Sequence, residues 1–516
     1  MEKLGLRKKM IINTISNYIT IIIKILIMLF LARTIFLGIT REEYGFWALL
    51  WSVFGYSLLL DFGFGTTIQK YTSELTINHN WDEYNQLIST FFFNYCLMSL
   101  LIVIVTVILS YFLNNIFNFQ NTDNIHYYKT ICLMFGIGTA VVFPFGFFAE
   151  ILRGLQKINL RNIIQLTFLI INFILMIAVI YSGFSLKGMT IVSVTTSLLT
   201  NLVMGYFCYK SIPQLKISLK HYNRHLIKDI MSFSLFAYLI IFSNMIIFKT
   251  DQIVISVFSS VAFVALYQIA ARISDTYKYF STQFLDNLGP VAAKLYTSNQ
   301  KEKLAEIMIQ SNRLLTAIST LILIPLLVYI KPILFIWLKL SDHTAAICSA
   351  ILLVSMFIMV ILRSSSVQVL IMSDEHKSLT KVAIIECTAN LLLSIILIRY
   401  IGIIGVAIGT IIPNAVLAFV YNVPKACKFA NVSLWKYVKE SFGSAIAIGM
   451  IVILIAYQLY RFHYPDTIFL LFLYSSLVSI TYLILYYIIG AHKWEKAQLH
   501  NYIKEKLLPN LVRSGL

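Results

Sequence analysis

The sequence predicts an all-α polytopic membrane protein with about fourteen transmembrane helices. Of its 516 residues, 59% are hydrophobic and only 12% are charged, and the mean hydropathy is +0.80. Soluble domains carry roughly 25% charged residues, so a soluble core is excluded. Apolar runs of about 20 residues recur along the chain with short polar gaps between them, which is typical of helical multi-pass membrane proteins.

Each apolar run is long enough to cross the hydrocarbon layer as one helix. We expect spans at residues 10–36, 44–62, 86–113, 129–151, 162–182, 188–209, 230–257, 262–290, 304–330, 343–372, 378–399, 403–424, 440–460 and 465–490. The polar gaps between these spans are short, so the sequence indicates no separate catalytic domain.

The distribution of lysine and arginine predicts the orientation of the spans. With cytoplasmic termini, 27 of the 41 Lys and Arg residues lie in cytoplasmic segments, 7 in external loops and 7 inside spans. Cytoplasmic loops are enriched in Lys and Arg, so we expect both termini to be cytoplasmic. The net charge of +18 is then mostly a topology signal beside anionic lipid headgroups, and it indicates no nucleic-acid partner.

A basic connector divides the spans into two groups. Residues 210–229 hold five Lys or Arg residues and separate six spans from eight. Short patterns recur at the same place in both halves, such as YGFWALL at Tyr44–Leu50 and VALYQIA at Val264–Ala270, which agrees with two parallel repeats. We expect a six-helix lobe at 1–209, the cytoplasmic linker at 210–229, a second six-helix lobe at 230–424, two additional helices at 425–490 and a cytoplasmic tail at 491–516.

Seven cations lie inside the predicted spans: Lys24, Arg33, Lys249, Arg272, Lys278, Arg313 and Arg363. A cation at the centre of a spanning helix costs about 2.5–3.5 kcal/mol on insertion scales. Arg33 and Arg313 lie near span ends, where we expect them to reach the headgroups. Lys24 lies at mid-span on a polar stripe with Asn17 and Thr20 and has no acidic neighbour on its helix.

Acidic residues near these cations offer partners for some of them. Arg272 and Asp275 are spaced for an i, i+3 pair, and Arg363 and Glu386 lie at similar depths, so we expect a structural pair there. Lys24 has no such partner on its own helix. Cations in excess within spans favour an anionic ligand, with phosphate foremost.

The six cysteines, at 96, 132, 208, 348, 387 and 427, are scattered, mostly within apolar runs, and show no C-x-x-C spacing. We therefore interpret them as small core residues, with no metal site or disulfide, and expect no cofactor. The two glycines of "DFGFG", Gly63 and Gly65, are expected to let the chain turn at a helix end. Asp61 beside them is expected to cap or contact a loop.

Three segments resemble polysaccharide repeat-unit flippases. "LDFGFGTTIQKYTSE" (Leu60–Glu74) is similar to their Asp-x-Gly-x-Gly segment after the second helix, and "LRGLQKINLRNI" (Leu152–Ile163) to their loop between helices 4 and 5. "KTDQIVISVFSSVAFVALYQIAARI" (Lys249–Ile273) is similar to their stretch from helix 7 to helix 8. The chain thus resembles the Wzx-type branch of the multidrug/oligosaccharidyl-lipid/polysaccharide (MOP) exporter superfamily.

This resemblance implies two six-helix lobes in a V-shaped arrangement plus two C-terminal helices. It also implies transport, in the bacterial inner (plasma) membrane, of undecaprenyl-pyrophosphate-linked oligosaccharide repeat units to the outer leaflet by alternating access. The product serves O-antigen, capsule or exopolysaccharide assembly, and other assembly proteins are expected partners. Lys24, Lys249, Arg272 and Lys278 are the predicted pyrophosphate contacts, with Lys24 central. Asp251, Asp275 and Glu386 are the predicted cavity carboxylates for coupling to protons or sodium.

Two related transporters are alternatives. A lipid II flippase would carry a similar pyrophosphate lipid. A cation-coupled multidrug exporter would need acidic residues to dominate its cavity, whereas cations outnumber acids in these spans. A membrane polymerase or ligase would need a large external loop, and the longest predicted one, at about 114–128, is too short, so we expect a transporter and no enzyme.

Overall fold

The computed structural model describes residues 22–502 except for 121, 224, 283–293, 296–297, 299 and 373–375. Its secondary structure is entirely helical within these residues, which confirms the predicted class. Among the described residues, ten helical segments are long and apolar enough to cross a membrane, and a bent pair adds an eleventh if it forms one span.

The spanning segments lie where hydropathy predicts them. They are Trp81–Tyr111, Thr122–Gly154, Ile158–Tyr181, Ser185–Ser211, Lys301–Val328, His343–Ile371, Ser378–Ile401, Ile403–Phe429, Leu434–Phe462 and Ile468–Gly490, with the bent pair at Arg41–Asp61 and Phe64–Ile77. Helical residues 22–38, α10 (His225–Phe258) and α11 (Val261–Thr282) correspond to the other three predicted spans. The total of fourteen stays a prediction, because the spans at 10–36 and 262–290 extend beyond the described residues.

The chain folds into two compact units. The first comprises Met1–Ile269 with Ala383–Gly409, and the second comprises Ala270–Val382 with Thr410–Leu516. Helices α11, α16 (His376–Ile401) and α17 (Ile403–Leu417) therefore contribute to both. The lobes expected at 1–209 and 230–424 were assigned from the order of the spans, whereas the two units are defined by their compactness. The expected lobes therefore stay a prediction.

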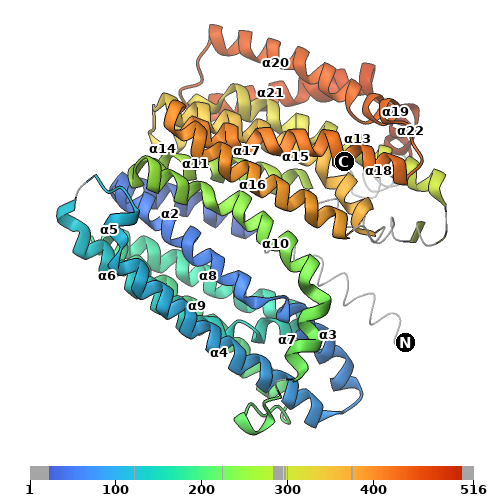
Figure 1. The fold of residues 1–516 in the computed structure, drawn as a ribbon. Helices are drawn as coiled ribbons and strands as arrows, with labels where there is room; N and C mark the ends of the chain where they lie inside the picture. Colours follow the sequence, from blue (N-terminus) through green and yellow to red (C-terminus); the bar gives the residue numbers. More distant parts are fainter. Residues whose placement is uncertain are drawn as a thin grey trace, which may run out of the picture. The chain divides into compact units, whose positions relative to one another are not determined.

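The first unit contains α10 and a bundle of four other long helices. In Figure 1, α4 (Trp81–Tyr111), α6 (Ile125–Val142), α8 (Ile158–Tyr181) and α9 (Ser185–Ser211) run alongside one another, with α4 against α6, α6 against α9 and α8 against α9. The shorter helices of this unit are α2 (Arg41–Gly55), α3 (Phe64–Ile77), α5 (Leu113–Ile116) and α7 (Phe148–Gly154).

One apolar core of the first unit holds α3, α4, α7 and α9 together. Tyr84, Phe91, Ile151 and Met204 are among its members, each at most 1% exposed. Burying a large apolar side chain contributes about 1.5–3 kcal/mol. This core packs α4, α7 and α9 together, and these three helices carry polar side chains of the candidate site.

The second unit is organised around α13 (Lys301–Val328). Helix α13 contacts α15 (His343–Met372), α20 (Ser444–Phe462) and α21 (Ile468–Leu485). Apolar residues of α13, α20 and α21 form one cluster that includes Ile324, Val452 and Val478. The remaining helices of this unit are α14 (Ile330–Leu338), α18 (Val423–Phe429), α19 (Leu434–Val438) and α22 (Lys493–Tyr502).

Candidate functional site

A sharp bend after α2 places the first carboxylate of the site. The 3-10 turn Tyr56–Asp61 continues α2, and Phe62 and Gly63 then take left-handed backbone angles, with φ of 47° and 81°. Glycine adopts such angles without steric cost, so Gly63 makes the turn as predicted. The bend amounts to 44° and leaves Asp61 at its corner.

Asp61 accepts hydrogen bonds from two other elements. Its Oδ1 accepts from the Tyr95 hydroxyl of α4, and its Oδ2 accepts from the Gly65 backbone N–H at 3.3 Å. The expected local contact of Asp61 is therefore confirmed by the bond to Gly65. The bond to Tyr95, which is 3% exposed, adds a tertiary role that the sequence did not predict.

A second carboxylate lies beside the first. Pro144 lies in the 3-10 turn Phe143–Phe145 between α6 and α7, and α7 carries Glu150 and Arg153 one turn apart. Arg153 Nη1 donates to Glu150 Oε2 at 3.1 Å.

Gly65 lets the two carboxylates approach each other. A Cβ atom at this position would lie 3.3 Å from Cγ of Glu150 and 3.5 Å from Oδ2 of Asp61. Gly65 lies inside α3, so its role is to leave space between these side chains and not to turn the chain as the sequence suggested.

These charged groups line a cavity of about 610 Å³ in the first unit. Its wall includes aromatic, hydroxyl, amide and charged side chains, among them Trp51, Asp61, Tyr95, Phe135, Glu150, Arg153, Ser197 and Asn201. Small-molecule sites typically occupy about 300–1,000 Å³ and combine apolar walls with a few polar groups. The cavity therefore has the size and the chemistry of a ligand site.

Lys24 lies near a second cation that the sequence did not single out. It is exposed on the helical residues 22–38, and counting 14 residues back from Gly38 at 1.5 Å each puts it about 21 Å along the helix from that end. The Lys24 ammonium and the Arg161 guanidinium in the first turn of α8 are close enough to repel each other electrostatically. Arg161 Nε is buried and has no hydrogen-bond partner among the described residues.

Arg161 connects Lys24 with the wall of the cavity. It interacts electrostatically with Arg153, which it repels, and with Glu150, which it attracts. Lys24, Arg161 and Arg153 thus form a set of three cations linked by pairwise repulsion, and of these three only Arg153 lines the described cavity. The sequence analysis placed Arg161 in a cytoplasmic loop. Its position in "LRGLQKINLRNI", a segment that resembles the flippases, was the available indication of a functional role.

Lys249 and Asp251 lie on α10 in the first unit. Asp251 is 5% exposed and accepts a hydrogen bond from the Tyr267 hydroxyl of α11. The Lys249 carbonyl accepts from the Ser52 hydroxyl, and neither Lys249 nor Asp251 lines the described cavity. Glu386, also in this unit, is 3% exposed. Their proposed ligand and coupling roles stay predictions.

The predicted cations of α11 lie in the second unit. Lys278 is attracted by Asp275, one turn before it, and repelled by Arg363. Arg272 Nε is buried without a hydrogen-bond partner among the described residues. The expected pair of Arg363 and Glu386 joins residues of different units and stays a prediction.

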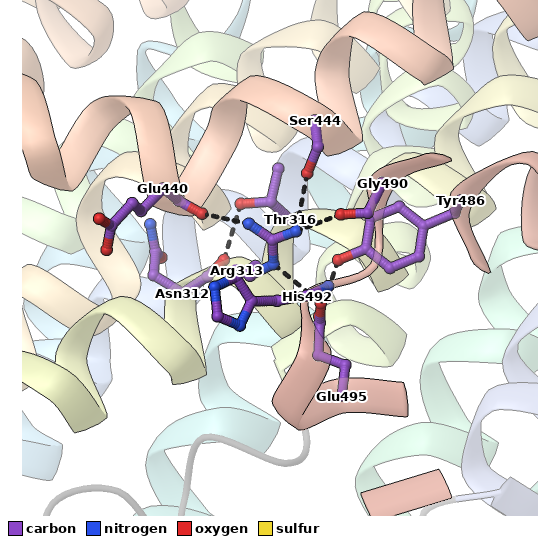
Figure 2. Close-up of polar contacts among 9 residues, drawn as sticks. All are labelled: Asn312, Arg313, Thr316, Glu440, Ser444, Tyr486, Gly490, His492 and Glu495. Atoms are coloured by element: carbon purple, nitrogen blue, oxygen red, sulfur yellow. Dashed lines mark hydrogen bonds and ion pairs between the residues drawn. The ribbon is translucent and has the colours of Figure 1, made fainter. Parts of the chain in front are cut away.

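The structure corrects the prediction that Arg313 reaches the lipid headgroups. Arg313 is 8% exposed inside the second unit, where Nε bonds to Glu495 Oε2 of α22 at 3.0 Å (Figure 2). Its other nitrogens donate to the Glu440 carbonyl at 2.8 Å, the Ser444 hydroxyl at 3.0 Å and the Gly490 carbonyl. The C-terminal segment folds back onto α13, which hydropathy alone does not predict.

Comparisons with known proteins support the same fold. The family model described as "Polysaccharide biosynthesis protein" matches residues 6–294, which include every residue lining the cavity. No curated protein matches the chain. A structure titled as the inward-facing conformation of a multidrug resistance MATE family transporter of the MOP superfamily is 17% identical, with a TM-score of 0.67 over 78% of this chain and 95% of that one.

Two further structures have the same fold. The lipid II flippase MurJ in an inward closed conformation is 15% identical, with a TM-score of 0.66 over 93% of this chain and 98% of that one. A MOP superfamily transporter from Pyrococcus furiosus, whose title reports a binding pocket of reversed polarity, is 14% identical, with a TM-score of 0.52 over 84% and 96%. At these identities the likeness shows a shared fold.

Proposed function

Because the chain belongs to the polysaccharide biosynthesis protein family, we propose that it is a flippase for undecaprenyl-pyrophosphate-linked oligosaccharide repeat units. It moves them from the cytoplasmic to the outer leaflet of the bacterial inner membrane by alternating access, with both of its own termini in the cytoplasm. The product serves O-antigen, capsule or exopolysaccharide assembly, together with other assembly proteins. It is a transporter and carries out no covalent chemistry.

The observation that carries this proposal is the position of the polar groups. The matched residues 6–294 contain both the cavity and the three interacting cations Lys24, Arg161 and Arg153. A pyrophosphate and its sugars cannot cross hydrocarbon unaided, because charged and polar groups lose their hydration there. A membrane protein that places cations beside a polar cavity supplies the missing interactions.

In this proposal Lys24 holds the pyrophosphate, and Lys249, Arg272 and Lys278 contact it at other stages of transport. Arg161 supports the role of Lys24, because the two neighbouring cations repel each other and an anion bound between them offsets this repulsion. Asp251, Asp275 and Glu386 are the proposed coupling carboxylates for protons or sodium. The hydrogen bond from Tyr267 gives Asp251 a partner that protonation of the carboxylate would weaken.

A second candidate, a cation-coupled multidrug exporter, is favoured by one observation. The charged groups lining the described cavity are two carboxylates and one guanidinium, a balance that suits an organic cation. A lipid II flippase is a third candidate. Its cargo carries a pyrophosphate, as does the cargo of a repeat-unit flippase.

Deletion of the gene tests these candidates against one another. The repeat-unit flippase predicts that the deletion strain loses its surface polysaccharide and that the intact gene restores it, while the deletion leaves the export of ethidium unchanged. Normal polysaccharide with reduced ethidium export would favour the drug exporter. Rescue of a strain depleted of its lipid II flippase would favour that alternative instead.

A further inference from the structure

We infer that the cavity of the first unit binds the sugar portion of the cargo and accepts neutral or amino sugars rather than uronic acids. This inference rests on the proposed function, because it names the part of the lipid-linked saccharide that the cavity holds. It assigns the sugar and the pyrophosphate to neighbouring places in one unit, with Arg153 between them.

A polar stripe on α9 is the first support. Ser193, Ser197 and Asn201 are spaced four residues apart, so they share one face of the helix, and all three line the cavity. The side chains of Ser197 and Asn201 form no hydrogen bond with another residue in the described part of the chain. Polar groups inside a spanning helix are costly without partners, and the hydroxyl groups of a sugar supply both donors and acceptors.

An aromatic surface on α2 and α6 is the second support. Trp51 lines the cavity and is 48% exposed. Its ring meets Phe135 edge to face, with 5.2 Å between centroids, and Trp47 in the same manner at 6.0 Å. Such contacts fix the ring orientation, and an amphipathic indole packs against the apolar C–H face of a sugar.

The charges of the cavity exclude an acidic sugar. Among the described residues that line the cavity, Asp61 and Glu150 carry negative charge and Arg153 alone carries positive charge, so this lining is net negative, although Arg161 outside it also attracts Glu150. A carboxylate brought beside Asp61 and Glu150 would meet like charges. The pyrophosphate therefore fits outside the cavity, where Arg161 interacts with both Lys24 and Arg153.

The bonds of these carboxylates favour a sugar over an organic cation. Asp61 already accepts from Tyr95 and Gly65, and Glu150 already accepts from Arg153. In the described part of the chain, the lining groups without a hydrogen-bond partner include the Ser197 hydroxyl and the Asn201 amide of α9, which are uncharged. A ligand rich in hydroxyl groups satisfies them, whereas an organic cation leaves them unpaired.

The test uses the full-length protein in lipid nanodiscs and water-soluble probes without lipid or pyrophosphate. Saturation-transfer NMR measures binding of N,N′-diacetylchitobiose, of methyl glucuronide and of tetraphenylphosphonium. We expect the chitobiose derivative to bind and the glucuronide to bind at least about tenfold more weakly, as expected when a like charge is unpaired in the site. Asn201→Leu should weaken chitobiose binding roughly fivefold, the effect of one net hydrogen bond, and Trp51→Ala about tenfold.

Trp435→Ala is the matched control, because Trp435 is 75% exposed on α19 and does not line the cavity. It should bind like the unsubstituted protein. Absence of chitobiose binding, binding unaffected by both cavity substitutions, or binding of tetraphenylphosphonium alone would each overturn the inference. Because no carrier lipid is present, a failure here is separate from failure of the flippase proposal, which the deletion strain tests.

Discussion

Two ion pairs, one in each unit, lie in contrasting surroundings. In the second unit, the side chains of Arg313 and Glu495 are 9% and 8% exposed, and every nitrogen of the guanidinium has an acceptor (Figure 2). In the first unit, the side chains of Arg153 and Glu150 are 43% and 21% exposed and line a cavity. The pair in the second unit is enclosed by protein, whereas the pair in the first unit is open to a ligand in the cavity.

This difference separates a pair that stabilises the fold from a pair that is accessible from the cavity. Removing one member of a buried pair leaves an uncompensated charge and costs about 3–5 kcal/mol. A partly exposed pair contributes about 0–1 kcal/mol, because water screens it. The stability of the fold therefore accounts for the buried Arg313, whereas it does not account for Arg153 and Glu150.

The largest effect is expected at Arg313. Arg313→Leu removes four hydrogen bonds and strands the Glu495 carboxylate, so the free energy of unfolding should fall by about 3–5 kcal/mol. Thermal unfolding of the purified protein in detergent measures this loss. Arg461→Leu, an exposed arginine in the last turn of α20, is the control and should unfold near the unsubstituted temperature.

The double change Arg313→Leu with Glu495→Leu tests whether these two residues stabilise the fold as a pair. Apolar replacement of both partners should recover much of the lost stability, since no charge is then left unpaired. Additive losses would contradict the assignment of this pair to the fold.

The predicted pair of Arg363 and Glu386 provides an intermediate case. Glu386 is 3% exposed, so if the pair forms it belongs with the buried class. Neutralising either residue should then lower the folded yield, and neutralising both should restore much of it. Folded yield measured by fluorescence-detected chromatography decides the outcome, and strictly additive losses would mean that the two residues do not meet.

The smallest change in stability is expected at the open pair. Glu150→Gln and Arg153→Gln should each change the free energy of unfolding by at most about 1 kcal/mol. Polysaccharide export should nonetheless fall, because both side chains line the cavity. Lys210→Gln, an exposed lysine in the last turn of α9, is the control for charge alone. Unchanged export in well-folded Glu150 and Arg153 variants would remove these residues from the transport path.

Hydropathy predicted the spans well because the bilayer acts on each segment locally. The span expected at 188–209 is observed within Ser185–Ser211, and that at 304–330 as Lys301–Val328. Backbone groups in hydrocarbon must bond within their own helix, so an apolar run of sufficient length determines the element by itself. The left-handed turn at Gly63 was likewise readable from local glycine chemistry.

The cavity was not predictable in the same way, because its members come from distant segments. Asp61, Tyr95 and Glu150 lie on three elements, and only tertiary packing brings them together. Arg313 was misplaced for the same reason: its depth along α13 suggested a headgroup contact, whereas Glu495 reaches it from 182 positions later in the chain.

Transport of a lipid-linked saccharide by reconstituted protein tests the central claim most directly. Fluorescent undecaprenyl-pyrophosphate disaccharide is placed in both leaflets of proteoliposomes, and dithionite is added outside. The account predicts that the full-length protein exposes the inner-leaflet label to reduction, whereas Lys24→Ala, folded and reconstituted equally, leaves that label protected. Lys24→Arg should retain part of the activity, because it keeps the charge and changes the geometry. Reduction no greater than in protein-free vesicles would contradict the flippase proposal, and full activity of Lys24→Ala would contradict the pyrophosphate role of Lys24.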